Sequence, residues 1–210
     1  MQPPPDDVMP WFSIWLKPRQ TMRQISDTDP SQNIVILSIL IGAAHALRHA
    51  ADNNAADFVP LTVVALAVLA TSVVIGPLSL YVGAAILHWV STRFEGQASV
   101  VELRAAIVWS AVPLIVGLVL WPPLIALVGP ELFSATKSSV EASPSLSSAV
   151  ALFAIVQTIL LVWSFVLQVL CLSQVTQLST LYGIILSIVP VFIFRVLTST
   201  AVVALLTLGA

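Results

Sequence analysis

The sequence predicts an all-α membrane protein, a bundle of five helical spans preceded by short amphipathic helices on the cytosolic face. The first observation is the stretch 59–90, which contains no Asp, Glu, Lys or Arg. It exceeds the ~20 apolar residues that cross the hydrocarbon core of a bilayer. The second is the stretch 142–194, which is also free of these residues. The third is a composition with only 9% charged residues, well below the ~25% of soluble domains.

The N-terminal segment, residues 1–31, is predicted to be cytosolic and to carry interfacial helices. Within it, Met9–Ile25 begins with Pro10, which suits the first turn of a helix, and Pro18 restarts the pattern. Tryptophan beside cations is typical of the headgroup level, so we predict two short helices lying on the inner membrane surface. The alternative is a loose tail whose tryptophans bind a protein partner. The residues concerned are Trp11, Trp15, Lys17, Arg19 and Arg23.

A transmembrane domain is predicted over residues 32–210. Its first span is short, and it reaches the far interface only if Arg48 and His49 extend to that level. Gly76-Pro77 in the second span predicts a kink, with a re-entrant hairpin as the rival interpretation. The five spans are expected at about 32–50, 60–92, 105–128, 148–172 and 178–206.

Charge placement predicts the orientation. With five spans and a cytosolic N-terminus, the outer segments carry only two cations, Arg48 and Lys137, against five in the inner segments. This distribution follows the positive-inside rule. The C-terminus then lies outside. Between the second and third spans, Ser99 and Glu102 have the spacing of a capping box that starts the next helix. The inner cations are Lys17, Arg19, Arg23, Arg93 and Arg104.

Two stretches resemble the bacterial branch of the Yip1 domain family. One is PWFSIWLKPRQTMRQISDTDP, ahead of a Gly-containing first span. The other is GPLSLYVGAAILHWVSTRFEGQASVVELRAAIVWSAVPLIV, with an aromatic-rich second span, a Gly-containing cytosolic turn, and Trp109 shortly before Pro113. The resemblance implies a five-span protein with a cytosolic N-terminus. Eukaryotic members bind Rab-type GTPases in vesicle traffic, but this chain lacks their Asp-Leu-Tyr-Gly-Pro signature, so that role is not carried over.

Arg195 is predicted near the middle of the fifth span, where an unpaired cation costs ~3 kcal/mol or more. Such an arginine needs a partner or a water-filled cavity, which makes it a candidate for a polar path through the membrane. Gln168 and Gln157 in the fourth span, and His88 near the inner end of the second, are its candidate companions. The plainer interpretations are that Arg195 lies at an interface and that the glutamines join helices by hydrogen bonds.

A weaker pattern is the pair His45 and His49, which are four residues apart and are followed by Asp52. On a helix the two imidazoles share a face, a spacing that can bind a transition metal. Two imidazoles and one carboxylate do not complete a site. We therefore predict no metal and no cofactor, and we interpret these residues as the interfacial end of a short span.

The sequence contains no nucleophile–base pairing, phosphate loop or dinucleotide fingerprint, so we predict that the protein is not an enzyme. The leading function is a scaffold or adaptor of the bacterial inner membrane, which binds a protein partner or organises lipid through its cytosolic face. Self-association is expected, whereas a nucleic-acid partner is not, because the net charge is -2. The alternative is a small transporter or channel with a polar path near Arg195.

Overall fold

The computed structural model describes residues 9–208, apart from the side chains of residues 190, 194, 198 and 201–208. These residues form helices joined by turns, with no strand among them, which confirms the predicted all-α class. Residues 1–8 of the predicted N-terminal segment lie outside the described part. Five helical stretches are long and apolar enough to cross a membrane: Ile34–Asp52, Leu61–Thr92, Val112–Phe133, Pro144–Thr176 and Thr180–Leu197.

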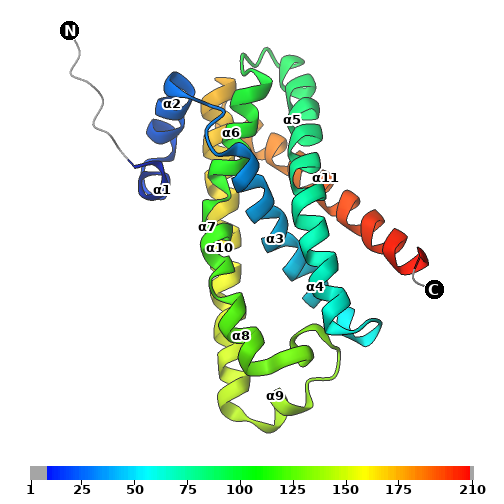
Figure 1. Cartoon of the computed structure of the whole chain (residues 1–210). Coiled ribbons are helices and arrows are strands. Elements are labelled where there is room, and N and C mark those ends of the chain that lie inside the picture. The colour runs from blue at the N-terminus through cyan, green and yellow to red at the C-terminus, as the bar shows by residue number, and fades with distance from the viewer. Residues whose placement is uncertain (1–8, 209–210) are drawn as a thin grey trace.

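The helices form a bundle in which α11 leaves the end of α10 and runs diagonally past α5 toward the C-terminus (Figure 1). In chain order the elements are α1 (Pro10–Ser13), α2 (Pro18–Thr28), α3 (Ile34–Asp52), the 3-10 helix η1 (Ala55–Asp57), α4 (Leu61–Ala70), the π-helical η2 (Thr71–Ile75), α5 (Gly76–Thr92), α6 (Val100–Ser110), α7 (Val112–Leu118), α8 (Trp121–Val128), the 3-10 helix η3 (Gly129–Phe133), α9 (Ser138–Ala142), α10 (Pro144–Thr176) and α11 (Thr180–Leu208).

The connections between spans lie at two opposite ends of the bundle. At one end, the backbone N–H of Gln97 donates to the carbonyl of Thr176 over 3.2 Å. The Arg19 side chain donates to the hydroxyl of Thr180 at the same end, over 2.9 Å. These bonds join α2, the turn after α5 and the turn between α10 and α11. The N-terminal helices and every second connection therefore share one side.

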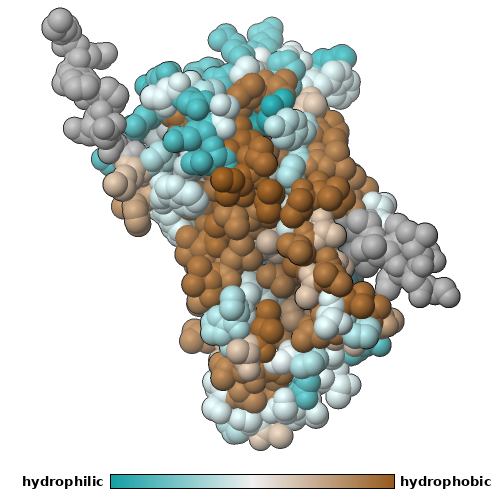
Figure 2. All heavy atoms as spheres, viewed as in Figure 1, coloured by the Kyte–Doolittle hydropathy of each residue, from teal (hydrophilic) through white to brown (hydrophobic). Residues whose placement is uncertain are grey.

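The opposite end is closed by the loops that follow α3 and α8. There the backbone N–H of Ala135 donates to the Asp57 carboxylate over 3.0 Å. Between the two ends, Figure 2 shows hydrophobic side chains covering the middle of the visible face, with hydrophilic ones gathered at its upper end. An apolar belt between polar ends is the surface expected of helices in a bilayer.

The second span is interrupted just before Gly76-Pro77, where the sequence predicts a kink. The chain forms a π-helical turn, Thr71–Ile75, and then continues as α5 without the reversal that a re-entrant hairpin requires. Pro77 has no backbone N–H to donate to the carbonyl of Val73, so the helix accommodates it with a wider turn.

This wider turn packs closely against α3. A Cβ atom added to Gly76 would lie 2.5 Å from the carbonyl oxygen of Ser38, and one added to Gly42 would lie 2.9 Å from that of Ser72. Small residues allow membrane helices to approach at backbone distance. The two glycines therefore set how closely the first and second spans pack.

The third span differs from the expected single helix over 105–128. Helix α6 begins at Val100, after the predicted capping box, in which the Ser99 Oγ accepts from the Glu102 N–H over 3.3 Å and the Glu102 carboxylate accepts from the Ser99 N–H over 2.8 Å. The helix then breaks at Ala111, because Pro113 has no backbone N–H to donate to the carbonyl of Trp109, four residues earlier. The apolar stretch continues to Phe133.

Candidate functional site

Helix α2 is fixed to one end of the bundle, where the predicted partner-binding residues gather. Its Met22 and Ile25 are buried, with 0% and 2% of their surface exposed, and it packs against α6 and α10. The Arg19 bond to Thr180 adds a polar contact on the same side. We define the platform as α2, the turn 93–99 and the turn 177–179. Its place on the cytosolic membrane surface stays a prediction.

The two N-terminal tryptophans are used in packing. Trp11 meets the buried ring of Trp109 edge-on, with ring centroids 5.5 Å apart, and Trp15 packs against the main core. The most exposed apolar side chains of this segment are Phe12 and Leu16, at 75% and 87%, whereas Trp11 is 38% exposed. Sequence reasoning missed these two, although each directly follows a tryptophan and so points away from the face that the tryptophans share.

The predicted cations at this end of the bundle differ in their exposure. The Arg93 guanidinium lies 4.9 Å from the ring centroid of Trp89, and that of Arg104 lies 4.2 Å from the ring of Tyr81. Such contacts are worth about 0.5–1 kcal/mol when exposed. Arg104 is half-buried, whereas Arg93 and Arg23 are exposed. Arg23 and Arg93 are therefore cations that a partner can reach.

A short polar turn connects the platform to the first span. The Asp29 carboxylate accepts hydrogen bonds from the hydroxyl and the backbone N–H of Ser31. These two bonds hold the pKa of Asp29 below its usual range. The carboxylate is ionised at neutral pH, and the turn loses this contribution as the pH falls through that lowered pKa.

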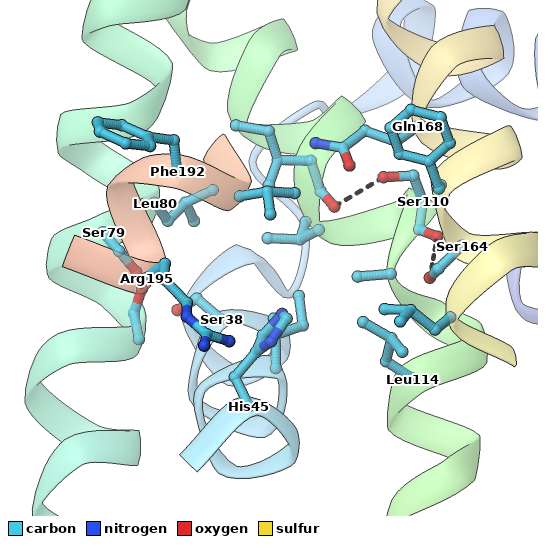
Figure 3. A pocket seen from close by; sticks show the side chains of 18 of the residues that line it. Ser38, His45, Ser79, Leu80, Ser110, Leu114, Ser164, Gln168, Phe192 and Arg195 are labelled. Carbon is cyan, nitrogen blue, oxygen red and sulfur yellow. Dashed lines mark hydrogen bonds between the residues drawn. The ribbon is translucent and has the colours of Figure 1, made fainter. Parts of the chain in front are cut away.

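A cavity of about 620 Å³ lies inside the bundle between α3, α5, α6, α10 and α11. Figure 3 shows Arg195 from α11 and His45 from α3 extending toward each other within it. The rest of the wall combines apolar side chains with serines and one amide. The labelled polar residues of the wall are Ser38, Ser79, Ser110, Ser164 and Gln168.

The four residues of the predicted polar path are only partly brought together. Arg195 and Gln168 line the same cavity. Gln157 lines a neighbouring cavity of about 150 Å³, and its amide donates to the Gly117 carbonyl over 3.0 Å. His88 lines neither, because its Nδ1 faces the carbonyl of Ala98 at 3.0 Å. Sequence reasoning placed His45 elsewhere, in a metal pattern, and missed its position beside Arg195.

His45, His49 and Asp52, the residues of the possible metal pattern, each face different neighbours. His45 faces the cavities, whereas the Nδ1 of His49 lies 3.2 Å from the side-chain nitrogen of Asn53. Asp52 pairs with Arg48, with Nε and Oδ2 3.9 Å apart. Within residues 9–208, no group of three or more His, Cys, Asp or Glu side chains is arranged to hold a metal ion.

Comparisons with known proteins agree with the sequence resemblance. A family model described as the Yip1 domain matches residues 12–201, which confirms the family that the two quoted stretches indicate. The match does not distinguish the bacterial branch, which stays a prediction. No curated protein and no solved structure matches this chain.

Proposed function

The chain belongs to the Yip1 domain family and is an integral membrane protein, and from this premise we propose that it is a non-enzymatic scaffold that recruits a protein partner through the platform. The observation that supports the proposal is the fixed position of α2. Burial of Met22 and Ile25 and the Arg19 bond hold the helix, while Arg23 and the neighbouring turn residues Arg93 and Gln97 remain exposed.

A fixed recognition surface has an energetic advantage over a loose tail. Its ordering entropy is already lost before binding, so less of the contact energy is spent when a partner docks. Helix α1 has a different role in this proposal. It lies on the flank of the bundle below α2 in Figure 1, and its exposed Phe12 and the following Leu16 suit the acyl boundary of the inner leaflet.

The test is purification of the tagged protein in native lipid discs, followed by mass spectrometry. The proposal predicts a protein recovered in stoichiometric amount, lost when Arg23→Ala is combined with Arg93→Ala. Lys137→Ala, at the opposite end of the bundle, is the matched control and should retain the partner. Loss of the partner with Phe12→Ala and Leu16→Ala, but not with the arginine variants, would contradict recruitment through the platform.

A small transporter is the second candidate, and one observation favours it. Arg195 and Gln168 line one cavity within the apolar part of the bundle, and intramembrane charges commonly mark substrate pathways. Solute flux into liposomes that Arg195→Ala abolishes would support this candidate. The same variant leaves the platform intact and should still recover the partner that the scaffold proposal predicts.

A further inference from the structure

The cavity at Arg195 has a positive character. Arginine keeps its charge in proteins, and none of the described residues that line the cavity is acidic. The serine hydroxyls of the wall donate to backbone carbonyls, as in the 2.9 Å bond from Ser164 to Ser110 and the 2.7 Å bonds from Ser38 to Val35 and from Ser79 to Ile75. Arg195 therefore carries the fixed positive charge of the cavity wall, with the His45 ring beside it.

We place the opening of the cavity between α10 and α11, because lining residues of both helices are exposed. The two helices are joined by the short turn 177–179 and then diverge, as Figure 1 shows. Both contribute wall residues that also have exposed surface, among them Val162 at 58%, Val191 at 52% and Phe192 at 66%. These side chains belong to the apolar surface of the spans, so this opening faces the acyl chains of the bilayer.

A second cavity adjoins the first at His45, Leu114 and Leu161 and extends to the end of the first span. His45 lines both cavities, and the smaller one continues past Arg48 to Asp52. Asp52, at the end of α3, lies seven positions after His45, which is about 10 Å along a helix. The smaller cavity therefore places polar side chains between His45 and the end of α3.

We propose that this cavity binds an anionic membrane lipid, whose phosphate lies against Arg195 and His45 and whose acyl chain occupies the apolar wall. Arginine matches phosphate with two parallel hydrogen bonds. The volume of about 620 Å³ lies within the range of ligand pockets, roughly 300–1,000 Å³. The apolar lining and the opening toward lipid select a lipid over a water-soluble anion. This inference is independent of the platform and its partner.

The experiment is native mass spectrometry of the full chain in detergent, titrated with phosphatidylglycerol. One bound phosphatidylglycerol is expected, held about tenfold or more tightly relative to zwitterionic phosphatidylcholine. Arg195→Ala should weaken phosphatidylglycerol binding by about tenfold. Lys137→Ala, which removes a cation outside both cavities, should leave it unchanged. Equal binding of the two lipids, or equal binding by the Arg195 variant, would overturn the proposal.

A second pair of variants tests the opening without changing charge. Val191→Trp places a large ring at the wall beside the opening and should reduce retention of phosphatidylglycerol. Val196→Trp, on the same helix and 44% exposed but outside the lining residues, is the matched control. Identical retention in both variants would contradict entry at this opening. Displacement of the lipid by millimolar inorganic phosphate would also overturn the lipid assignment in favour of a free anion.

Discussion

Trp11, in the first helix of the chain, packs edge-on against Trp109, with ring centroids 5.5 Å apart and ring planes at 69°. Trp109 is 1% exposed and belongs to the main core. The contact therefore ties the N-terminal helices to the interior of the bundle. It also explains why a segment that precedes the first span is held in place instead of depending on lipid alone.

Trp11→Ala should loosen the N-terminal helices while the spans stay folded. An aromatic pair of this geometry is worth about 0.5–1.5 kcal/mol beyond the area that it buries. Hydrogen exchange should accelerate over residues 9–28 and remain unchanged over α10. Phe12→Ala is the control, because Phe12 is 75% exposed, and equal acceleration in that variant would contradict a specific role for the contact.

Trp109 should tolerate phenylalanine much better than alanine. Its indole N–H has no hydrogen-bond partner among the described residues, so Trp109→Phe removes only part of the packing. Trp109→Ala leaves a cavity, at a cost of about 3–5 kcal/mol. Thermal unfolding in detergent should separate the two variants clearly, and similar melting temperatures would show that the ring is not packed as described.

Gly76→Ala should destabilise the packing between the first and second spans. The added methyl group would lie 2.5 Å from the Ser38 carbonyl oxygen, and backbone at this distance must shift, at a cost of about 1–3 kcal/mol. A lower melting temperature in detergent is the expected result. Ala65→Val enlarges an exposed position of α4 and should have little effect. A neutral Gly76→Ala would contradict the close crossing.

Gln157→Leu should separate the two roles that the sequence allows for Gln157. Its amide donates to the Gly117 carbonyl over 3.0 Å, and bonds of this kind between membrane helices are worth about 0.6 kcal/mol on average. A small fall in stability with unchanged lipid binding at Arg195 is expected, because Gln157 lines the other cavity. Loss of lipid binding without loss of stability would assign Gln157 to a continuous polar path instead.

Ser99→Ala should weaken the start of α6. It removes a capping box in which Ser99 and Glu102 satisfy each other's backbone N–H groups, at a cost of about 1 kcal/mol. Thermal unfolding measures the effect, and the exposed Ser147→Ala is the control at the start of α10. Equal stability of both variants would show that the cap contributes nothing.

The features set by local chemistry could be predicted from the sequence. Uncharged apolar stretches long enough to cross a bilayer indicate the spans, and the spacing of Ser99 and Glu102 indicates the start of α6. Gly76-Pro77 indicates an irregular helix, because the missing N–H of proline is a property of the residue itself. The two quoted stretches of sequence were sufficient to indicate the family.

The features that depend on contacts between distant residues could not be predicted. Periodicity places Trp11 on a helical face but does not reveal that this face meets Trp109. It groups His45 with His49, although the fold brings His45 beside Arg195, 150 residues later in the chain. His88 and Gln157 are residue types that suit a polar path, but His88 faces the carbonyl of Ala98 and Gln157 donates to that of Gly117.

The arrangement of both ends is tested most directly by labelling single cysteines with a membrane-impermeant maleimide in intact cells. Cys171 is the one natural cysteine, and Cys171→Ala provides the background. Gln97→Cys reports the platform, and Thr136→Cys reports the opposite end; both positions are exposed. We predict that Thr136→Cys reacts in intact cells and that Gln97→Cys reacts only after lysis. Labelling of Gln97→Cys from outside would place the platform on the wrong side of the membrane and contradict its role in recruiting a cytosolic partner.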